Sequence, residues 1–185
     1  MELERLEIHR SVRREYRILL RIDAELLLPI KEKAIREFYR SLWERCFAWA
    51  RDEYGAELLR AYDALENNGE RARVRAQTYR FCIRLCYEDD AIAAILCESA
   101  ILGRWTGPGD GYRRLSHVWQ KNEELLLPME QIMSHFGVRI PKSRLPFQPD
   151  GIYPDGEGVV LFRNVTTDSP FLEKRLILAE NEDTI

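Results

Sequence analysis

The stretches "YRFCIRLCYEDDAIAAILCESAIL" (79–102) and "GYRRLSHVW" (111–119) hold the pattern that decides the fold. From Tyr79 to Tyr87 the apolar residues occupy odd positions, which predicts a half-buried strand. Residues 91–102 are apolar at both parities, which is typical of a central strand covered on both faces. Short polar turns separate these runs, so the sequence predicts an antiparallel β-meander within 71–119.

The segment just before this meander has the opposite parity. Its apolar side chains stand at even positions, Ala72, Val74, Ala76 and Thr78, and the pattern changes at Tyr79. A change of parity within one strand indicates a β-bulge, or a helix end followed by a new strand. The sequence leaves both readings open.

The N-terminal part predicts a strand region over 12–28 and a long helix over 30–66. In the strand, Tyr16, Ile18, Leu20 and Ile22 share one face, and the interleaved arginines predict a solvated opposite face. After Pro29 the apolar period becomes three to four residues, and Gly69 is the predicted stop. A helix of this length exceeds what the domain needs, so we expect a break, with Gly55 as the bend. The apolar stripe comprises Ile35, Phe38, Tyr39, Leu42, Trp43, Cys46, Phe47, Ala50, Tyr54, Leu58, Tyr62 and Leu65.

The C-terminal third predicts a short helix over 128–137 and a hairpin or strands over 141–180. Pro128 suits the first turn of that helix, and Gly137 ends it. "VVLFR" (159–163) reads as a strand, and "FLEKRLILA" (171–179) as a strand with a helical alternative. We therefore predict one α+β domain over 1–185, in which an antiparallel sheet packs against one long helix, with a second short helix.

Composition predicts a soluble protein without affinity for nucleic acid. The chain has 185 residues, a net charge of −3, 45% hydrophobic and 32% charged residues. No segment could span a bilayer, and the charged N-terminus does not resemble a signal peptide, so we expect a cytoplasmic protein, or an exported one if a leader has been removed. Four cysteines without CxxC spacing favour buried reduced thiols, the alternative being a disulfide from Cys82 or Cys86 to Cys97.

No motif in the chain predicts a cofactor or a metal. The glycine-rich loop 103–112 lacks the phosphate-binding patterns GxxxxGK[ST] and GxGxxG. His9, His117 and His135 fall on three different elements, without HxxxH or HExxH spacing. No serine or cysteine has a histidine at the spacing of a nucleophile pair. We expect no catalytic residues, no cofactor and no metal.

Three polar residues nevertheless invite a functional interpretation. Asp110 and His117 are close in sequence, although an aspartate in a turn usually accepts hydrogen bonds from the turn backbone. His117 shares the parity of Leu115 and Trp119, which favours a half-buried strand histidine. Glu98 lies in an apolar run, where an ion pair with Arg80 or Arg84 is the favoured interpretation over catalysis.

The aromatic residues around the loop predict a recognition surface. Trp105 and Tyr112 flank the loop, and amphipathic rings at a loop rim are typical of binding sites. Together with Asp110, His117 and Trp119 they form the predicted ligand-binding or partner-binding face.

The order of the elements resembles the extracytoplasmic domain of RsiV-type anti-sigma factors, which also occurs in PdaC-type peptidoglycan deacetylases and in clostridial proteins. The resemblance runs through "YRILLRI" (16–22), the long helix and residues 78–133, and continues in "LPFQPDGIYPDGEGVVLFRN" (145–164). Asp110 stands where that family has a histidine, and Gln120 where it has an aspartate. The family's "APYA" segment is not visible after Val165. The chain thus resembles a divergent, leaderless member.

The resemblance implies an α+β fold and a role in lysozyme sensing or cell-wall recognition, and it carries over no catalytic residue. Our first hypothesis is a non-enzymatic binding or sensing module whose partner is a protein or a cell-wall glycan. The second is a hydrolase that uses Asp110, His117 and Glu98, which would require the three to converge at one pocket. The third is a structural protein that forms a homo-oligomer.

Overall fold

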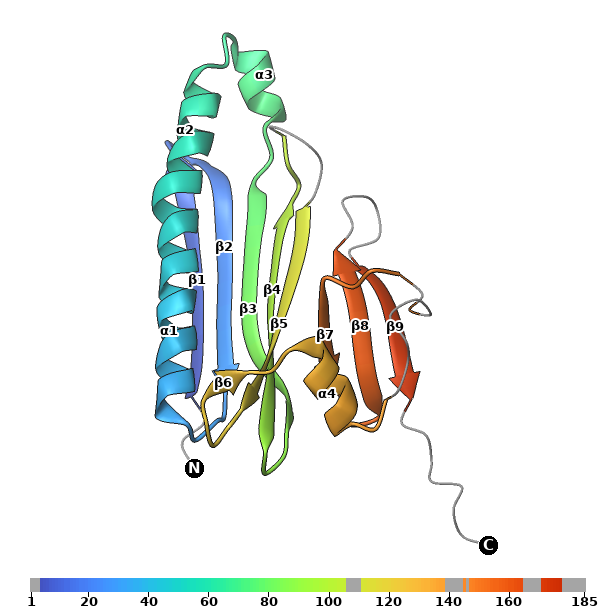
Figure 1. Ribbon diagram of the computed structural model, residues 1–185. Coiled ribbons are helices and arrows are strands. Elements are labelled where there is room, and N and C mark those ends of the chain that lie inside the picture. Colours follow the sequence, from blue (N-terminus) through green and yellow to red (C-terminus); the bar gives the residue numbers. More distant parts are fainter. Residues whose placement is uncertain (1–3, 106–110, 139–144, 146, 165–170, 178–185) are drawn as a thin grey trace, which may run out of the picture. The chain divides into compact units, whose positions relative to one another are not determined.

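The computed structural model describes residues 4–105, 111–138, 145, 147–164 and 171–177 (Figure 1). Within these residues the strands form a six-stranded sheet in the order β1-β2-β3-β4-β5-β6 and a three-stranded sheet in the order β7-β8-β9. A long helix and shorter helices complete the α+β fold that the sequence predicts.

The N-terminal strand region is a hairpin rather than one strand. β1 (Glu4–Arg14) pairs antiparallel with β2 (Arg17–Leu28), so the predicted range 12–28 began too late and missed the turn. Tyr16, expected on the buried face, lies in this turn and is 81% exposed. The turn places Glu15 at a φ of 54°, a left-handed conformation that usually calls for glycine. Because no glycine stands there, periodicity alone could not locate the turn.

The predicted long helix is confirmed, with a π-helical segment in its middle. α1 (Lys33–Ala48) continues through η1 (Trp49–Tyr54) into α2 (Gly55–Asp63). Its buried side chains recur mostly every fourth residue, and each such step rotates the stripe by about 40° in an α-helix. A π turn holds more residues than an α turn and rotates the stripe back toward the sheet. The buried residues are Ile35, Tyr39, Trp43, Ala50, Tyr54, Leu58 and Tyr62.

Gly55 allows a close approach and does not bend the helix. Its backbone is helical, with φ of −60° and ψ of −41°. A Cβ atom at this position would lie 2.9 Å from Cγ2 of Val12 on β1. The helix therefore packs tightly on the first hairpin at the point where the π segment ends.

The parity change before the meander marks a helix followed by a new strand. α3 (Asn68–Arg73) precedes β3 (Gln77–Glu88), and Asn67 caps the helix by accepting a hydrogen bond from the Glu70 N–H at 2.9 Å. Gly69 lies inside α3, so the prediction that it ends the long helix was wrong.

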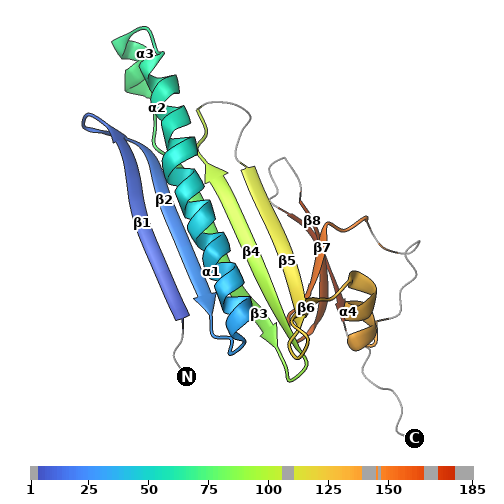
Figure 2. The ribbon, with the colours of Figure 1, turned by 60° about the vertical axis from the view of Figure 1, so that its left-hand side comes forward.

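The meander itself is confirmed as β3, β4 (Ile92–Leu102) and β5 (Gly111–Gln120), followed by the short β6 (Leu125–Leu126). β4 is buried at both parities from Ile92 to Cys97, as a central strand should be. Figures 1 and 2 show the long helix returning the chain to the end of the sheet where β2 began, so β2 and β3 run in the same direction. The sheet is otherwise built from antiparallel neighbours, as β1/β2 and β5/β6 illustrate.

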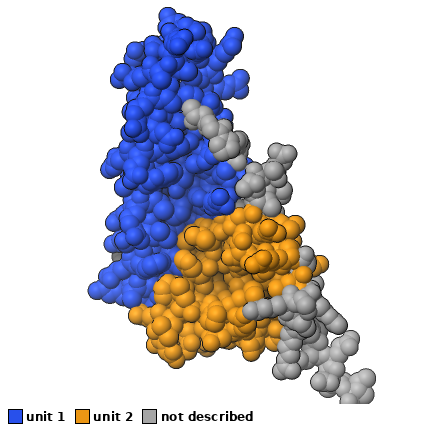
Figure 3. All heavy atoms as spheres, turned by 45° about the horizontal axis from the view of Figure 1, so that its top comes forward, with its two compact units in different colours: residues 1–83, 98–113 blue, residues 84–97, 114–185 orange. Residues whose placement is uncertain are grey.

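The chain divides into two compact units, coloured separately in Figure 3. Unit 1 comprises residues 1–83 and 98–113, and unit 2 comprises residues 84–97 and 114–185. In unit 1 the even-numbered residues of β2 from Leu20 to Leu28 are buried, while Arg10, Arg13, Arg14 and Arg21 are exposed, as the predicted solvated face requires. That the chain forms one α+β domain over 1–185 stays a prediction.

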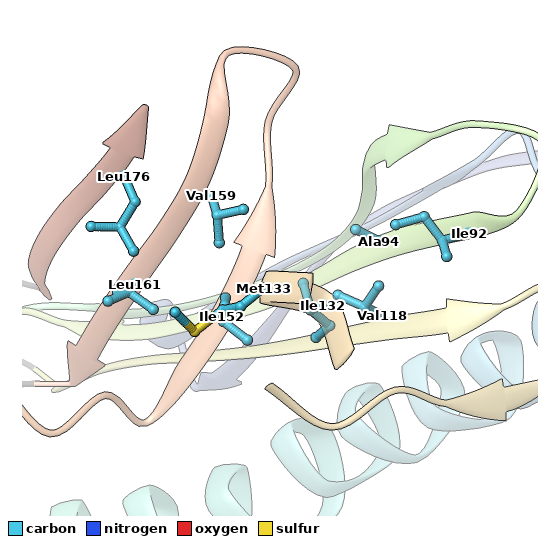
Figure 4. Packing of buried hydrophobic residues seen from close by; sticks show 9 residues of the cluster. All are labelled: Ile92, Ala94, Val118, Ile132, Met133, Ile152, Val159, Leu161 and Leu176. Atoms are coloured by element: carbon cyan, nitrogen blue, oxygen red, sulfur yellow. The ribbon is translucent and has the colours of Figure 1, made fainter. Parts of the chain in front are cut away.

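Unit 2 has its own apolar core, in which two sheets and a helix contribute side chains (Figure 4). The predicted short helix is present as α4 (Met129–His135), and the C-terminal strands are β7 (Gly151–Pro154), β8 (Gly158–Asn164) and β9 (Phe171–Ile177). The helical alternative for the last of these was wrong. The core residues are Ile92, Ala94, Val118, Ile132, Met133, Ile152, Val159, Leu161 and Leu176.

Candidate functional site

The residues of the predicted recognition face are distributed over both units. Trp105 and Tyr112 belong to unit 1, whereas His117 and Trp119 belong to unit 2. Asp110 lies outside the described residues. The recognition face as a whole therefore stays a prediction.

In unit 1, Trp105 and Tyr112 are both half-buried. The indole Nε1 of Trp105 is buried and has no hydrogen-bond partner within the described part of the chain. A buried indole N–H usually finds an acceptor. A Cβ at Gly111, which precedes Tyr112, would lie 3.3 Å from the guanidinium Nη2 of Arg104, which leaves little space at the start of β5.

In unit 2, a pocket of about 330 Å³ opens beside β5. Apolar side chains of the segment 126–132 and of β7 supply much of its wall, and Leu126 remains 50% exposed. Ser116, His117 and Asp150 add polar groups. An apolar wall with a few convergent polar groups is the usual composition of a ligand site.

His117 is the predicted site residue that lies at this pocket. It is half-buried, as expected, and burial lowers its pKa and favours the neutral imidazole. The burial expected for the odd face, which His117 shares with Leu115 and Trp119, was wrong, however. β5 buries its even face, with Arg114 and Val118, while Leu115 on the odd face is 56% exposed.

Ser116 and Asp150 are pocket residues that the sequence did not single out. The hydroxyl of Ser116 accepts a hydrogen bond from the Ile152 N–H at 3.0 Å, which ties β7 to β5. A Cβ at Gly151 would lie 2.3 Å from Cζ of Phe162 and 2.8 Å from the Ser116 Oγ, so only glycine fits there. The Asp150 carboxylate accepts from the backbone N–H of Asn164 at 2.8 Å.

Next to the pocket, the side chain of Asn164 makes two hydrogen bonds to the backbone of the buried Arg114, as a neighbouring strand would. The backbone N–H of Arg114 donates to Oδ1 of Asn164 at 2.7 Å, and Nδ2 of Asn164 donates to the Arg114 carbonyl at 3.1 Å. The Arg114 guanidinium pairs with Glu173 and lies over the rings of Tyr153 and Phe162. This network fixes the edge of β5 at the mouth of the pocket. The sequence signal for a buried Arg114 was its even position, which it shares with the buried Val118.

The polar residues of the pocket do not form a nucleophile–base pair. Ser116 and His117 are consecutive on a strand, so their side chains point to opposite faces. The Asp150 carboxylate is held by Asn164 through the backbone N–H and the side-chain amide. What the pocket offers chemically is hydrogen bonding beside an apolar wall.

The other two histidines, His9 and His135, lie beside acidic side chains. His9 is 2.8 Å from Asp23 and 3.0 Å from Glu7, and these hydrogen bonds raise its pKa. His135 is 3.2 Å from Asp89. Burial alone would raise the pKa of Asp89. The hydrogen bonds that its carboxylate accepts from the N–H groups of Ile92 and Ala91 and from His135 and Tyr87 outweigh burial, so the pKa of Asp89 is lowered.

The described residues contain no group of three or more His, Cys, Asp or Glu side chains that could hold a metal ion. All four cysteines are unbridged, so the alternative of a disulfide from Cys82 or Cys86 to Cys97 is not realised. In the part of the chain that the structure describes, no helix has both the length and the apolar character needed to cross a membrane.

The fold is thus an α+β protein with a long helix on a mostly antiparallel sheet and a pocket beside β5. Two solved structures of the DUF3298 family are similar to it. One, from Bacteroides fragilis, has a TM-score of 0.60 and 9% sequence identity; the other, from Pseudomonas aeruginosa PAO1, has a TM-score of 0.52 and 14% identity. Each alignment covers 95% of this chain and 90% of the other. At these identities the likeness establishes a shared fold.

No protein-family model and no curated protein matches the sequence.

Proposed function

We propose that the chain is a non-enzymatic recognition module that binds a protein or a cell-wall glycan through β5 and the pocket beside it. The observation that carries the proposal is the composition of this pocket. Ser116 and Asp150 place polar groups next to an apolar wall that includes the half-exposed Leu126, and His117 lines the same pocket from the next position of β5. Such a surface gives orientation through hydrogen bonds and affinity through apolar burial.

The resemblance to RsiV-type extracytoplasmic domains narrows the candidate partners to two. It supports lysozyme or a peptidoglycan fragment as the ligand, and the fold likeness to DUF3298 proteins is consistent with that resemblance. We further propose that the predicted face of Trp105, Asp110, Tyr112, His117 and Trp119 contacts the same partner. Aromatic rings are suited to stacking on sugar rings and to protein contacts alike.

The test is a binding titration of the full chain with lysozyme and with purified muropeptides. Leu126→Ser and His117→Ala should each weaken binding by about tenfold, because each removes a contact worth on the order of 1.4 kcal/mol. Leu172→Ser is the matched control, since Leu172 is a comparably exposed leucine (47%) on β9.

Trp105→Ala and Asp110→Ala test the wider face in the same assay. If neither ligand binds, the proposed partners are wrong. If a ligand binds equally to wild type, Leu126→Ser and His117→Ala, the assignment of the pocket is wrong.

A further inference from the structure

Unit 1 contains a second pocket, of about 660 Å³, that plays no part in the proposed function. It lies where the turn between β1 and β2 meets the end of α2 and the helix α3. Arginines from three different elements line it: Arg14 from β1, Arg17 from β2 and Arg71 from α3. The carboxylates in the wall are Glu15 and Asp63.

One of the three arginines is already neutralised. Nε of Arg14 donates to Oδ1 of Asp63 at 3.0 Å, which forms a salt bridge between β1 and α2. This ion pair holds the pocket wall together and takes up the negative charge of Asp63. The remaining charges in the wall are those of Arg17 and Arg71 against the single carboxylate of Glu15, which leaves a net positive charge.

Arg17 and Arg71 have poorly used hydrogen-bond donors. Within the described residues, each donates to a main-chain carbonyl at 3.4 Å, Arg17 to Ala72 and Arg71 to Asp63, and neither lies within 4.0 Å of a carboxylate. Nε of Arg71 is buried and has no acceptor in this part of the chain. A guanidinium carries five N–H donors, so most of those in this pocket face no protein acceptor.

The surroundings fix the direction in which these charges can act. The Arg71 guanidinium lies over the Tyr62 ring, 5.7 Å from its centroid, and the Arg17 guanidinium lies over the Tyr16 ring at 5.6 Å. Stacking of this kind orients the planar fork and leaves its edge free to bind an anion. Tyr16 itself is 81% exposed at the turn.

We propose that this pocket binds the phosphate group of a phosphorylated ligand. Two guanidinium forks with vacant donors require several acceptor oxygens, and a phosphate presents three or four of them where a carboxylate presents two. The pocket is larger than a phosphate alone needs, and the exposed Tyr16 ring offers apolar surface to the group that carries the phosphate. A phosphate ester therefore fits better than inorganic phosphate.

The experiment is a calorimetric titration of the full chain with inorganic phosphate and with phenyl phosphate, and a flotation assay on phosphatidylcholine vesicles with and without phosphatidic acid. Arg17→Gln and Arg71→Gln should each weaken binding about tenfold or more, because each removes charge-assisted hydrogen bonds. Arg71→Lys keeps the charge, loses the fork, and should weaken binding by less. Arg10→Gln is the control, since it removes the same charge from an exposed site on β1 outside the pocket.

Tighter binding of phenyl phosphate than of inorganic phosphate, lost in the pocket variants and retained in Arg10→Gln, supports the proposal for a soluble ligand. Binding only to vesicles that contain phosphatidic acid, with the same dependence on the variants, supports it with a lipid headgroup as the source. No binding in any arm would overturn it, and so would equal weakening by Arg10→Gln. Should the Arg71 variants fail to fold, Arg17→Gln still tests whether the pocket binds phosphate.

Discussion

Asn164→Ala should destabilise unit 2 although the residue lies near the surface. Its side-chain amide makes three hydrogen bonds: with the Arg114 N–H at 2.7 Å, the Arg114 carbonyl at 3.1 Å and the Asp150 carboxylate at 3.3 Å. A typical bond contributes about 1 kcal/mol, and an unsatisfied buried donor costs about 1–3 kcal/mol. Arg114 is buried, so we expect a loss of about 2–4 kcal/mol.

The assay combines urea unfolding with hydrogen exchange at the Arg114 amide. In Asn164→Ala the unfolding midpoint should fall and the amide should exchange faster, because its N–H has lost its acceptor. Asn164→Asp separates hydrogen bonding from shape: it keeps the acceptor for the Arg114 N–H, cannot donate to the Arg114 carbonyl, and adds a charge next to Asp150. It should lose at least half as much stability as Asn164→Ala.

Asn122→Ala, at an exposed turn position, serves as the control and should change stability by less than about 0.5 kcal/mol. An Arg114 amide that is equally protected in wild type and Asn164→Ala would show that the Asn164 side chain is not its acceptor. A fully stable Asn164→Asp would also contradict a stabilising role for the amide hydrogen bonds, since the side chain would then contribute only by filling space.

Two further predictions concern the stability of single side chains. Tyr54→Phe removes the hydroxyl that donates to the fully buried Gln77, and should cost about 1–3 kcal/mol in thermal or urea unfolding, whereas Tyr16→Phe at the exposed turn should be neutral within about 0.5 kcal/mol. Equal effects of the two would show that the buried bond is unimportant. For His117 the pKa is lowered by burial, so stability is complete while the imidazole is neutral and falls as the pH drops from the unfolded pKa of about 6.5 to the folded one. His117→Gln should abolish this loss. His9→Gln should act oppositely, because hydrogen bonds to its acidic neighbours raise its pKa and the stabilisation is lost as the pH rises. NMR titration of both rings checks the two directions, and a His117 midpoint above 6.5 would contradict the first.

The regular elements could be predicted because their periods are strong. Alternation from Tyr79 to Tyr87 and the double-parity run after it marked β3 and β4, and the three-to-four period marked the long helix. What periodicity could not supply was the turn at Glu15. That residue takes a left-handed conformation without being a glycine, so a turn that depends on the whole hairpin left no local signal.

The pocket beside β5 could be predicted only in part. His117 was singled out, but its neighbours Leu126 and Asp150 come from segments that approach β5 only in the folded chain. Arg114 was not singled out, although it shares the even parity of the buried Val118. On a strand one of two consecutive residues must point inward, and here the inward one is neutralised by Glu173 and capped by Asn164.

The most direct test of the recognition proposal is a map of the ligand contact by NMR. Lysozyme or a muropeptide is titrated into the isotope-labelled chain, and the backbone amide shifts are followed residue by residue. We predict that the largest shifts fall at 116–118, 126–127 and 150–152, which line the pocket beside β5. Saturable binding with its largest shifts on β1 or β9 and none at these segments would contradict it.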